Sequence, residues 1–103
     1  MKAGVLMNAS GIHANVIEEI IVLAKKYQID KVILFGSRAR GDFRRTSDID
    51  LAVCGGDVVR FTLAVDEETS TLLQYDIVNL DGAVQPELLE SIETEGKVLY
   101  EKI

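Results

Sequence analysis

Little in this sequence is typical of a secreted or membrane-bound protein. It has one cysteine, Cys54, so a disulfide within the chain and a cysteine-rich zinc site are both excluded. No apolar run approaches the roughly 20 residues that a membrane-spanning helix needs. Residues 1–10 hold one lysine and no long apolar segment, which makes them a poor secretory signal. We therefore expect a cytoplasmic protein that does not associate with a membrane.

Basic residues are also scarce. Lys and Arg number 11 against 17 Asp and Glu, which gives a net charge of −6 and an isoelectric point of about 4.7. Non-specific binding to duplex nucleic acid requires a broad basic surface, so that function is not expected. The arginines are unevenly distributed, however, because four of them lie between Arg38 and Arg45. Such a cluster in an acidic protein favours a local site for an anion.

The 103 residues, of which 48% are apolar, suffice for one modest core, so we expect a single domain over residues 1–103. Apolar residues at helical spacing predict helices over 11–28, 57–72 and 86–95. Asn8 or Ser10 is the expected N-cap of the first. Short β-branched runs predict strands over 31–35, 48–54 and 75–80, with 97–100 as a last strand or a segment that packs down. This alternation predicts an α/β (α+β) fold, with a small, mixed, mostly buried sheet flanked by helices.

Two aspartates, Asp48 and Asp50, stand at positions i and i+2 of one predicted strand. Side chains on a strand alternate between its faces, so both carboxylates are expected on one face, roughly 7 Å apart. Two carboxylates beside a packed core repel each other, and a hard cation such as Mg²⁺ relieves the repulsion. The pair therefore predicts a metal site, with an ordinary solvated strand edge as the alternative.

A third acid, Asp76, is the only charged residue of the run 75–80. If this strand lies beside the one that carries Asp48 and Asp50, three carboxylates share one patch. Such a set can hold two divalent ions about 3.5–4 Å apart, an arrangement used for in-line displacement at phosphorus. The acids at 66–68 compete for the same role, but they lie outside an apolar, strand-like run.

A Gly-Ser turn follows the predicted strand 31–35 directly. Gly36 allows phosphate oxygens to approach the backbone closely, and Ser37 offers a hydroxyl and an N–H. A short helix that begins here would favour an anion at its N-terminus. Arg38 and Arg40 can neutralise phosphate charge, although a surface or ion-pair role is an equal alternative.

The spacing of these motifs resembles that of the DNA polymerase β-type nucleotidyltransferase superfamily, in which Gly-Ser, ten residues and Asp-x-Asp follow one another. Here Gly36-Ser37 is followed by residues 38–47 and then by Asp48-Ile49-Asp50. The segments GSRARG and SDIDL are similar to the minimal nucleotidyltransferases of bacteria and archaea. The resemblance implies a polymerase β palm-like fold. It also implies a Mg²⁺-dependent transfer of a nucleoside monophosphate from an NTP to an acceptor hydroxyl, with release of pyrophosphate.

The resemblance also implies residue roles. Asp48 and Asp50 would bind both of two Mg²⁺ ions, and Asp76 would complete the catalytic metal and help to activate the acceptor. Gly36 and Ser37 would hold the β- and γ-phosphates.

A partner is implied in the same way, because larger members of the superfamily carry a second domain for the acceptor and this sequence leaves no room for one. Minimal members are commonly paired with a small helical protein of the HEPN type. In some pairs the nucleotidyltransferase is an antitoxin that adds AMP from ATP to a tyrosine of a toxic RNase. Two alternatives stay open: a non-catalytic module that binds nucleotide and partner, and transfer to a small molecule or RNA with a separate substrate-binding subunit. A homo-oligomer or partner surface formed by Ile12, Ile17 and Ile21 is also open.

Overall fold

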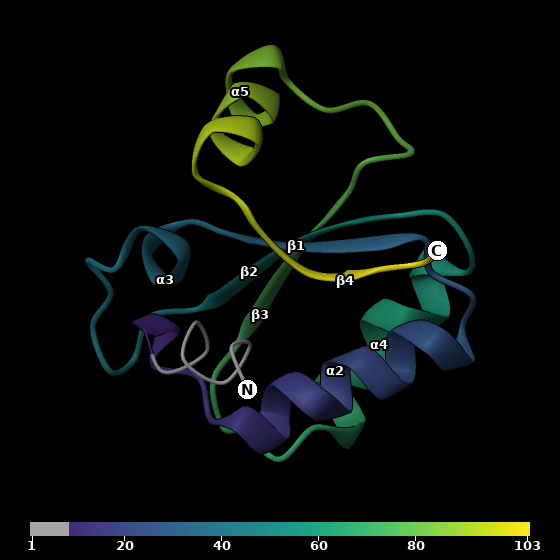
Figure 1. Cartoon of the computed structure of the whole chain (residues 1–103), viewed down its shortest axis with the longest axis horizontal. Coiled ribbons are helices and arrows are strands. Elements are labelled where there is room, and N and C mark those ends of the chain that lie inside the picture. The colour runs from purple at the N-terminus through teal and green to yellow at the C-terminus, as the bar shows by residue number, and fades with distance from the viewer. Residues whose placement is uncertain (1–8) are drawn as a thin grey trace.

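Helices and strands alternate along the chain, as expected, in the computed structural model, which describes residues 9–103 (Figure 1). The elements follow in the order α2 (Ala14–Lys26), β1 (Lys31–Phe35), α3 (Ser37–Arg40), β2 (Ile49–Cys54), α4 (Val58–Glu68), β3 (Tyr75–Asn79), α5 (Pro86–Glu95) and β4 (Lys97–Glu101). The last segment is therefore a true strand, and most bounds fall within a residue of those expected. The exceptions are both ends of α2, expected at 11 and 28, and the end of α4, expected at 72.

The first helix is shorter than its apolar pattern predicts. Gly11 has a φ of +71°, and the N-cap residue His13 has extended backbone angles (φ −59°, ψ 143°), so helical geometry starts only after it. Ser10 was an expected cap, but its hydroxyl accepts the N–H of Ile12 at 3.2 Å instead. The other expected cap, Asn8, lies outside the described residues.

The helix expected over 57–72 ends early, at Glu68. Thr69 turns the backbone to an extended conformation (φ −88°, ψ 154°). Its hydroxyl lies 2.6 Å from the carbonyl oxygen of Val65, to which it donates, and 2.8 Å from the Tyr75 hydroxyl. α4 therefore ends four residues before its expected end, and the extended backbone at Thr69 leads the chain toward β3.

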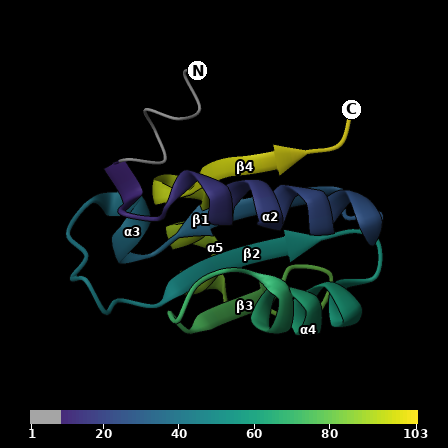
Figure 2. The ribbon, with the colours of Figure 1, turned by 90° about the horizontal axis from the view of Figure 1, so that it is seen from below.

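The four strands form one mixed sheet in the order β3-β2-β1-β4. β1 runs antiparallel to both β2 and β4, whereas β2 and β3 are parallel. Parallel neighbours require a crossover connection, and α4 supplies it. Figure 2 shows α2 and α4 side by side on one face of the sheet, with α5 on the other.

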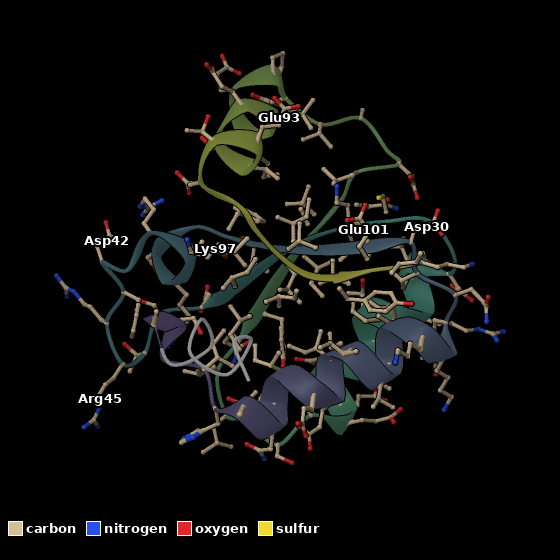
Figure 3. All side chains as sticks on the ribbon, viewed as in Figure 1. Asp30, Asp42, Arg45, Glu93, Lys97 and Glu101 are labelled. Atoms are coloured by element: carbon tan, nitrogen blue, oxygen red, sulfur yellow. The ribbon has the colours of Figure 1, made fainter. Side chains whose placement is uncertain are left out.

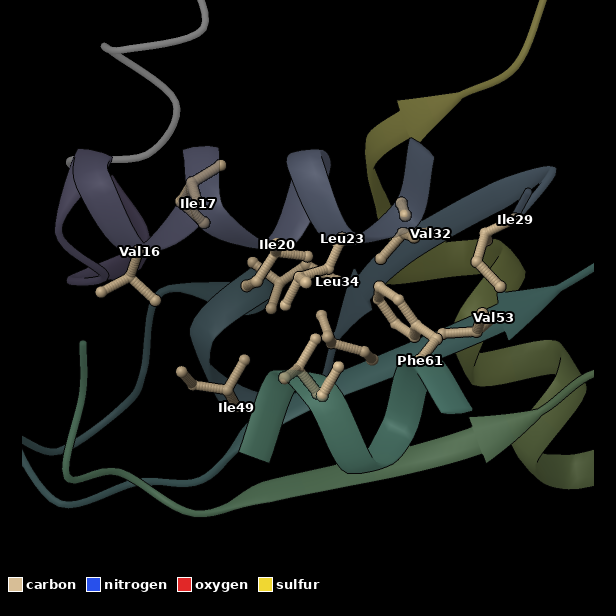
Figure 4. Packing of buried hydrophobic residues seen from close by; sticks show 14 of the residues in the cluster. Val16, Ile17, Ile20, Leu23, Ile29, Val32, Leu34, Ile49, Val53 and Phe61 are labelled. Carbon is tan, nitrogen blue, oxygen red and sulfur yellow. The ribbon is translucent and has the colours of Figure 1, made fainter. Parts of the chain in front are cut away.

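The main core lies between the sheet and the pair α2 and α4 (Figure 4). Alternate strand residues point into it, as their β-branched pattern predicts. Burial is complete or nearly so for Val16, Ile17, Ile20, Val32, Leu34, Ile49, Leu51, Val53, Phe61 and Val65. This face of the sheet fixes the register of the central strands, because a shift of one residue would turn the apolar side chains out of the core.

The other face of the sheet is only partly covered, by α5. Ile92 is the only buried residue of that helix, and it packs against Phe35 and Ala52. β3 and β4, at the two edges of the sheet, contain no fully buried residue. The expectation of a mostly buried sheet therefore holds for its central strands and for the α2/α4 face alone. The remaining open face is where strand residues can meet a ligand.

The apolar residues that reach the surface are not those expected for a contact with another protein. Ile12 and Ile17 belong to the core, which is the favoured interpretation of the apolar residues in this helix, and Ile21 is half-buried, so these residues do not form the alternative surface. Within residues 9–103, no helix has the length and hydropathy needed to cross a bilayer.

The arrangement of the core predicts that substitutions at two positions of α4 have very different effects on the free energy of unfolding. Phe61→Ala should lower the free energy of unfolding by about 3–5 kcal/mol, because it leaves a cavity beneath α2. Leu63→Ala, on the same helix but with 58% of its side chain exposed, should change it by less than about 0.5 kcal/mol. Urea unfolding followed by circular dichroism measures both. Equal losses at the two positions would contradict this arrangement of the core.

Candidate active site

Strand pairing brings the predicted acids to one end of the open face. Asp50 is paired with Phe35 of β1 on one side and with Asp76 of β3 on the other. Paired residues of neighbouring strands share a face of the sheet, and Phe35 identifies this face as the one beneath α5. Asp48 lies just before β2, two residues from Asp50. The sheet thus places the three aspartates in one region, with Asp50 half-buried and the other two exposed.

The Gly-Ser turn lies directly against this region. Gly36 follows the last residue of β1 and has a φ of +77°, and Ser37 begins the short helix α3. A Cβ atom on Gly36 would overlap the Oδ2 atom of Asp50. Both the backbone angle and the space therefore require glycine here, and they bring the turn and the carboxylate of Asp50 into contact.

Burial and like charge act together on Asp50. They raise the pKa of its carboxyl group to about 6, with burial as the largest cause and the charges of Asp76 and Asp48 as the next. The guanidinium groups of Arg40 and Arg38 oppose this shift without cancelling it. The positive charges near the carboxylate of Asp50 therefore do not compensate for its burial and for the neighbouring negative charges.

A divalent cation fits this set of donors. The side chains that face the Gly36 turn carry carboxylate oxygens, which are the ligands that Mg²⁺ prefers. Within residues 9–103, however, no three acidic, His or Cys side chains are gathered closely enough to form a ready-made metal centre. The like charges of Asp76 and Asp48 that raise the pKa of Asp50 are charges that a bound cation would offset.

Arg38 does not face the predicted phosphate site. Its side chain is 2% exposed, and its guanidinium lies 4.8 Å from the centre of the Phe43 ring. The guanidinium donates to four backbone carbonyl groups, those of Ser10, Arg44, Arg45 and Ser47, at 3.0–3.3 Å. Its donors are thus engaged in holding the loop that leads to Asp48, a structural role that the sequence reasoning did not foresee.

Arg40, by contrast, is exposed at the surface of α3. Its guanidinium donates to Glu95 at 2.8 Å and to Asp42 at 3.3 Å. Figure 3 shows Asp42 and Arg45 on the outer loop, away from the sheet. Of the two arginines expected to neutralise phosphate, only Arg40 stands at the surface beside the Gly36 turn.

Glu95 is a site residue that sequence reasoning missed. It is the last residue of α5, and one carboxylate oxygen, Oε1, accepts hydrogen bonds from both the Gly36 N–H, at 3.1 Å, and Arg40. Nothing in the sequence near Glu95 distinguishes it from the other glutamates of α5. Only the packing of α5 over β1 brings it to the turn.

Comparison with known proteins agrees with this geometry. Residues 18–103 match the family described as polymerase beta, nucleotidyltransferase. The chain belongs to this family. It is therefore a nucleotidyltransferase, and divalent metal is the general requirement of such enzymes.

Individual relatives support the assignment. A Methanocaldococcus jannaschii protein, provisionally named a protein adenylyltransferase, is 38% identical over 95 residues, which are 81% of this chain and 92% of the relative. A structure of a toxin–antitoxin with AMP-PNP matches with a TM-score of 0.64 and 28% identity, over 84% of this chain and 73% of the other. A provisionally named nucleotidyltransferase of Sulfolobus solfataricus shares the fold, with a TM-score of 0.54 and 19% identity over 94% and 87% of the two chains.

The buried guanidinium of Arg38 predicts a local loss of structure when it is removed. Arg38→Met should lower the free energy of unfolding by about 2–3 kcal/mol, because the loop loses charge-assisted hydrogen bonds to buried donors. Hydrogen exchange at the Arg44 and Ser47 amides, which bond within this loop, should accelerate at least tenfold. Arg45→Met, at an exposed position of the same loop, is the control. Unchanged exchange in Arg38→Met would show that the loop does not depend on this side chain.

The raised pKa of Asp50 predicts how stability depends on pH. The folded protein retains this proton up to about pH 6, whereas the unfolded chain releases it near pH 4, so folding is favoured less as pH rises between these values. In buffer with EDTA, Asp50→Asn should therefore be more stable than the wild type at pH 8, by about 1 kcal/mol after allowance for solvent screening.

The difference should disappear at pH 4, where Asp50 is protonated in the wild type. Thermal unfolding at both pH values measures it, with Asp66→Asn, at an exposed position of α4, as the control. A less stable Asp50→Asn at pH 8 would contradict the repulsion inferred here.

Proposed function

We propose that this chain transfers AMP from ATP to a hydroxyl group of a partner protein. The observation that carries the proposal is the register that places Asp50 beside Asp76 and against Gly36. One end of the sheet then offers carboxylates for a divalent cation and, within contact distance, a backbone turn for phosphate. A nucleoside triphosphate with its cation requires both features at one place.

The residues take distinct roles in this proposal. Asp48, Asp50 and Asp76 would hold two Mg²⁺ ions, which supply charge neutralisation at the triphosphate. The Gly36 and Ser37 N–H groups and the Ser37 hydroxyl would bind the β- and γ-phosphates, and Arg40 would neutralise their outer charge.

In the reaction, the acceptor oxygen forms a bond to the α-phosphorus of ATP. The bond between this phosphorus and the oxygen that bridges it to the β-phosphorus breaks at the same time. Pyrophosphate leaves, and the proton of the acceptor hydroxyl passes to a carboxylate oxygen of Asp76. The exposed position of Asp76 at the edge strand β3 gives an acceptor on another protein access to it. Most of the catalytic effect comes from positioning and from neutralising charge.

The comparisons support a protein as the acceptor. The relative from Methanocaldococcus jannaschii is named for transfer of AMP to protein. Solved neighbours are toxin–antitoxin assemblies, one of them with AMP-PNP and another a mutant of MntA-HpeT with two aspartates changed to glutamate. We infer that the partner is the toxin of such a pair, a small helical protein of the HEPN type, and that this chain is its antitoxin.

The proposal predicts transfer of label from α-labelled ATP to a helical protein of the HEPN type, where one is encoded beside this chain, in the presence of Mg²⁺. Asp50→Asn should lower the rate at least a hundredfold, because it removes a shared cation ligand. EDTA should abolish the transfer. Asp66→Asn should retain the wild-type rate, since Asp66 is exposed on α4 on the other side of the sheet.

Two outcomes would contradict transfer to protein. Label found in RNA or in a small molecule would assign another acceptor. Binding of ATP with Mg²⁺ but no transfer, together with neutralisation of the partner by an Asp48→Asn, Asp50→Asn double variant, would identify a binding module without catalysis.

A further inference from the structure

We propose that Glu95 is an anionic placeholder for the triphosphate. Its carboxylate accepts from the Gly36 N–H and the Arg40 guanidinium, and nucleotide binding displaces it from both. This inference rests on the proposed function, because it assigns these two donors to phosphate.

The geometry places one carboxylate oxygen on two groups expected to bind phosphate. Oε1 of Glu95 is 3.1 Å from the Gly36 nitrogen and 2.8 Å from Nη1 of Arg40. Gly36 has a single N–H, so it cannot donate fully to a phosphate while Glu95 accepts from it. A carboxylate that receives an N–H and a guanidinium together has the same partners that a phosphate oxygen would have.

The location of Glu95 on its helix is electrostatically unfavourable. The C-terminal end of a helix carries partial negative charge, and negative side chains there are destabilising. α5 has glutamates at 87, 90, 93 and 95 and no basic residue in its last turn. Within the described residues, the compensating contacts of Glu95 come from outside the helix, from Arg40 and Gly36.

Displacement of Glu95 requires only a change of side-chain rotamer. Its side chain is 22% exposed, so the released carboxylate can turn into solvent. A triphosphate close to a carboxylate experiences strong repulsion, since both are negative and the site excludes part of the water. Nucleotide binding is therefore an exchange of one anion for another, and the charge of Glu95 weakens the apparent affinity for ATP.

The test compares two glutamates of α5 that differ in their contacts. Glu95→Gln keeps the shape of the side chain but removes its charge, and Glu93→Gln makes the same change at an exposed position (Figure 3). Binding of a non-hydrolysable ATP analogue with Mg²⁺ is measured by calorimetry. We expect Glu95→Gln to lower Kd roughly two- to fivefold, the range of one partly exposed ion pair. Glu93→Gln should change Kd less than twofold.

Arg40 provides a second arm of the experiment. Arg40→Ala should raise Kd, and in that background Glu95→Gln should still lower it, because Glu95 continues to accept from the Gly36 N–H and to repel the triphosphate. In the wild-type protein, the amide resonance of Gly36 should shift when the analogue binds. In Glu95→Gln, the chemical shift of the Gly36 amide before the analogue is added should lie closer to its value in the bound state.

The outcomes separate this inference from the proposed function. A higher Kd in Glu95→Gln would overturn the inference, because it would mean that Glu95 positions Arg40 for phosphate. An unchanged Kd would overturn it as well, since the carboxylate would then not compete. Failure of the wild-type protein to bind the analogue at all would overturn the proposed function and the inference together. Circular dichroism confirms that each variant is folded, and Glu95→Ala replaces Glu95→Gln if that variant is not.

Discussion

The antiparallel pairing of β1 with β2 is the constraint on which the site depends. It sets Asp50 opposite Phe35, so that the carboxylate reaches the turn that begins at the very next residue. Glycine at position 36 leaves the space that this carboxylate fills. Because strand residues alternate between faces, a shift of one residue would turn Asp50 into the apolar core and Leu51 toward the turn. The core residues of β1 and β2 therefore fix the position of the acids as firmly as any contact within the site.

Packing leaves the charge in the site unbalanced. Asp50 is half-buried beside two other acids, which raises its pKa to about 6. Two arginines lie near enough to lower it, but both are engaged elsewhere: Arg38 with backbone carbonyl groups and Arg40 with Glu95 and Asp42. In the proposed function, a cation would relieve the repulsion among the acids, and a phosphate would take over the donors that Glu95 holds. Both ligands would then remove unfavourable electrostatic interactions of the folded protein.

Many features of the fold could be predicted from residue patterns, and the predictions that failed share a cause. The β-branched runs located the strands closely, because only a few residue types suit a buried strand. The end of α4 was wrong by four residues: the backbone becomes extended at Thr69, whose hydroxyl contacts that of Tyr75 on another element. Arg38 and Arg40 are the same residue type two positions apart, yet one is buried and the other exposed. Their difference depends on which side of α3 faces the loop, and a four-residue helix gives no periodic signal for that.

The amino-acid sequence by itself determined the fold class and the kind of enzyme. The Gly-Ser turn and the two aspartates ten residues beyond it lie within one continuous segment, so their spacing along the chain already constrains their spacing in space. Tertiary structure alone decided which strand lies beside β2, that Asp76 is paired with Asp50, and that Glu95 from α5 reaches Gly36 and Arg40. The reason is physical: contacts between residues far apart in the chain depend on how whole elements pack, and local residue patterns do not encode that packing.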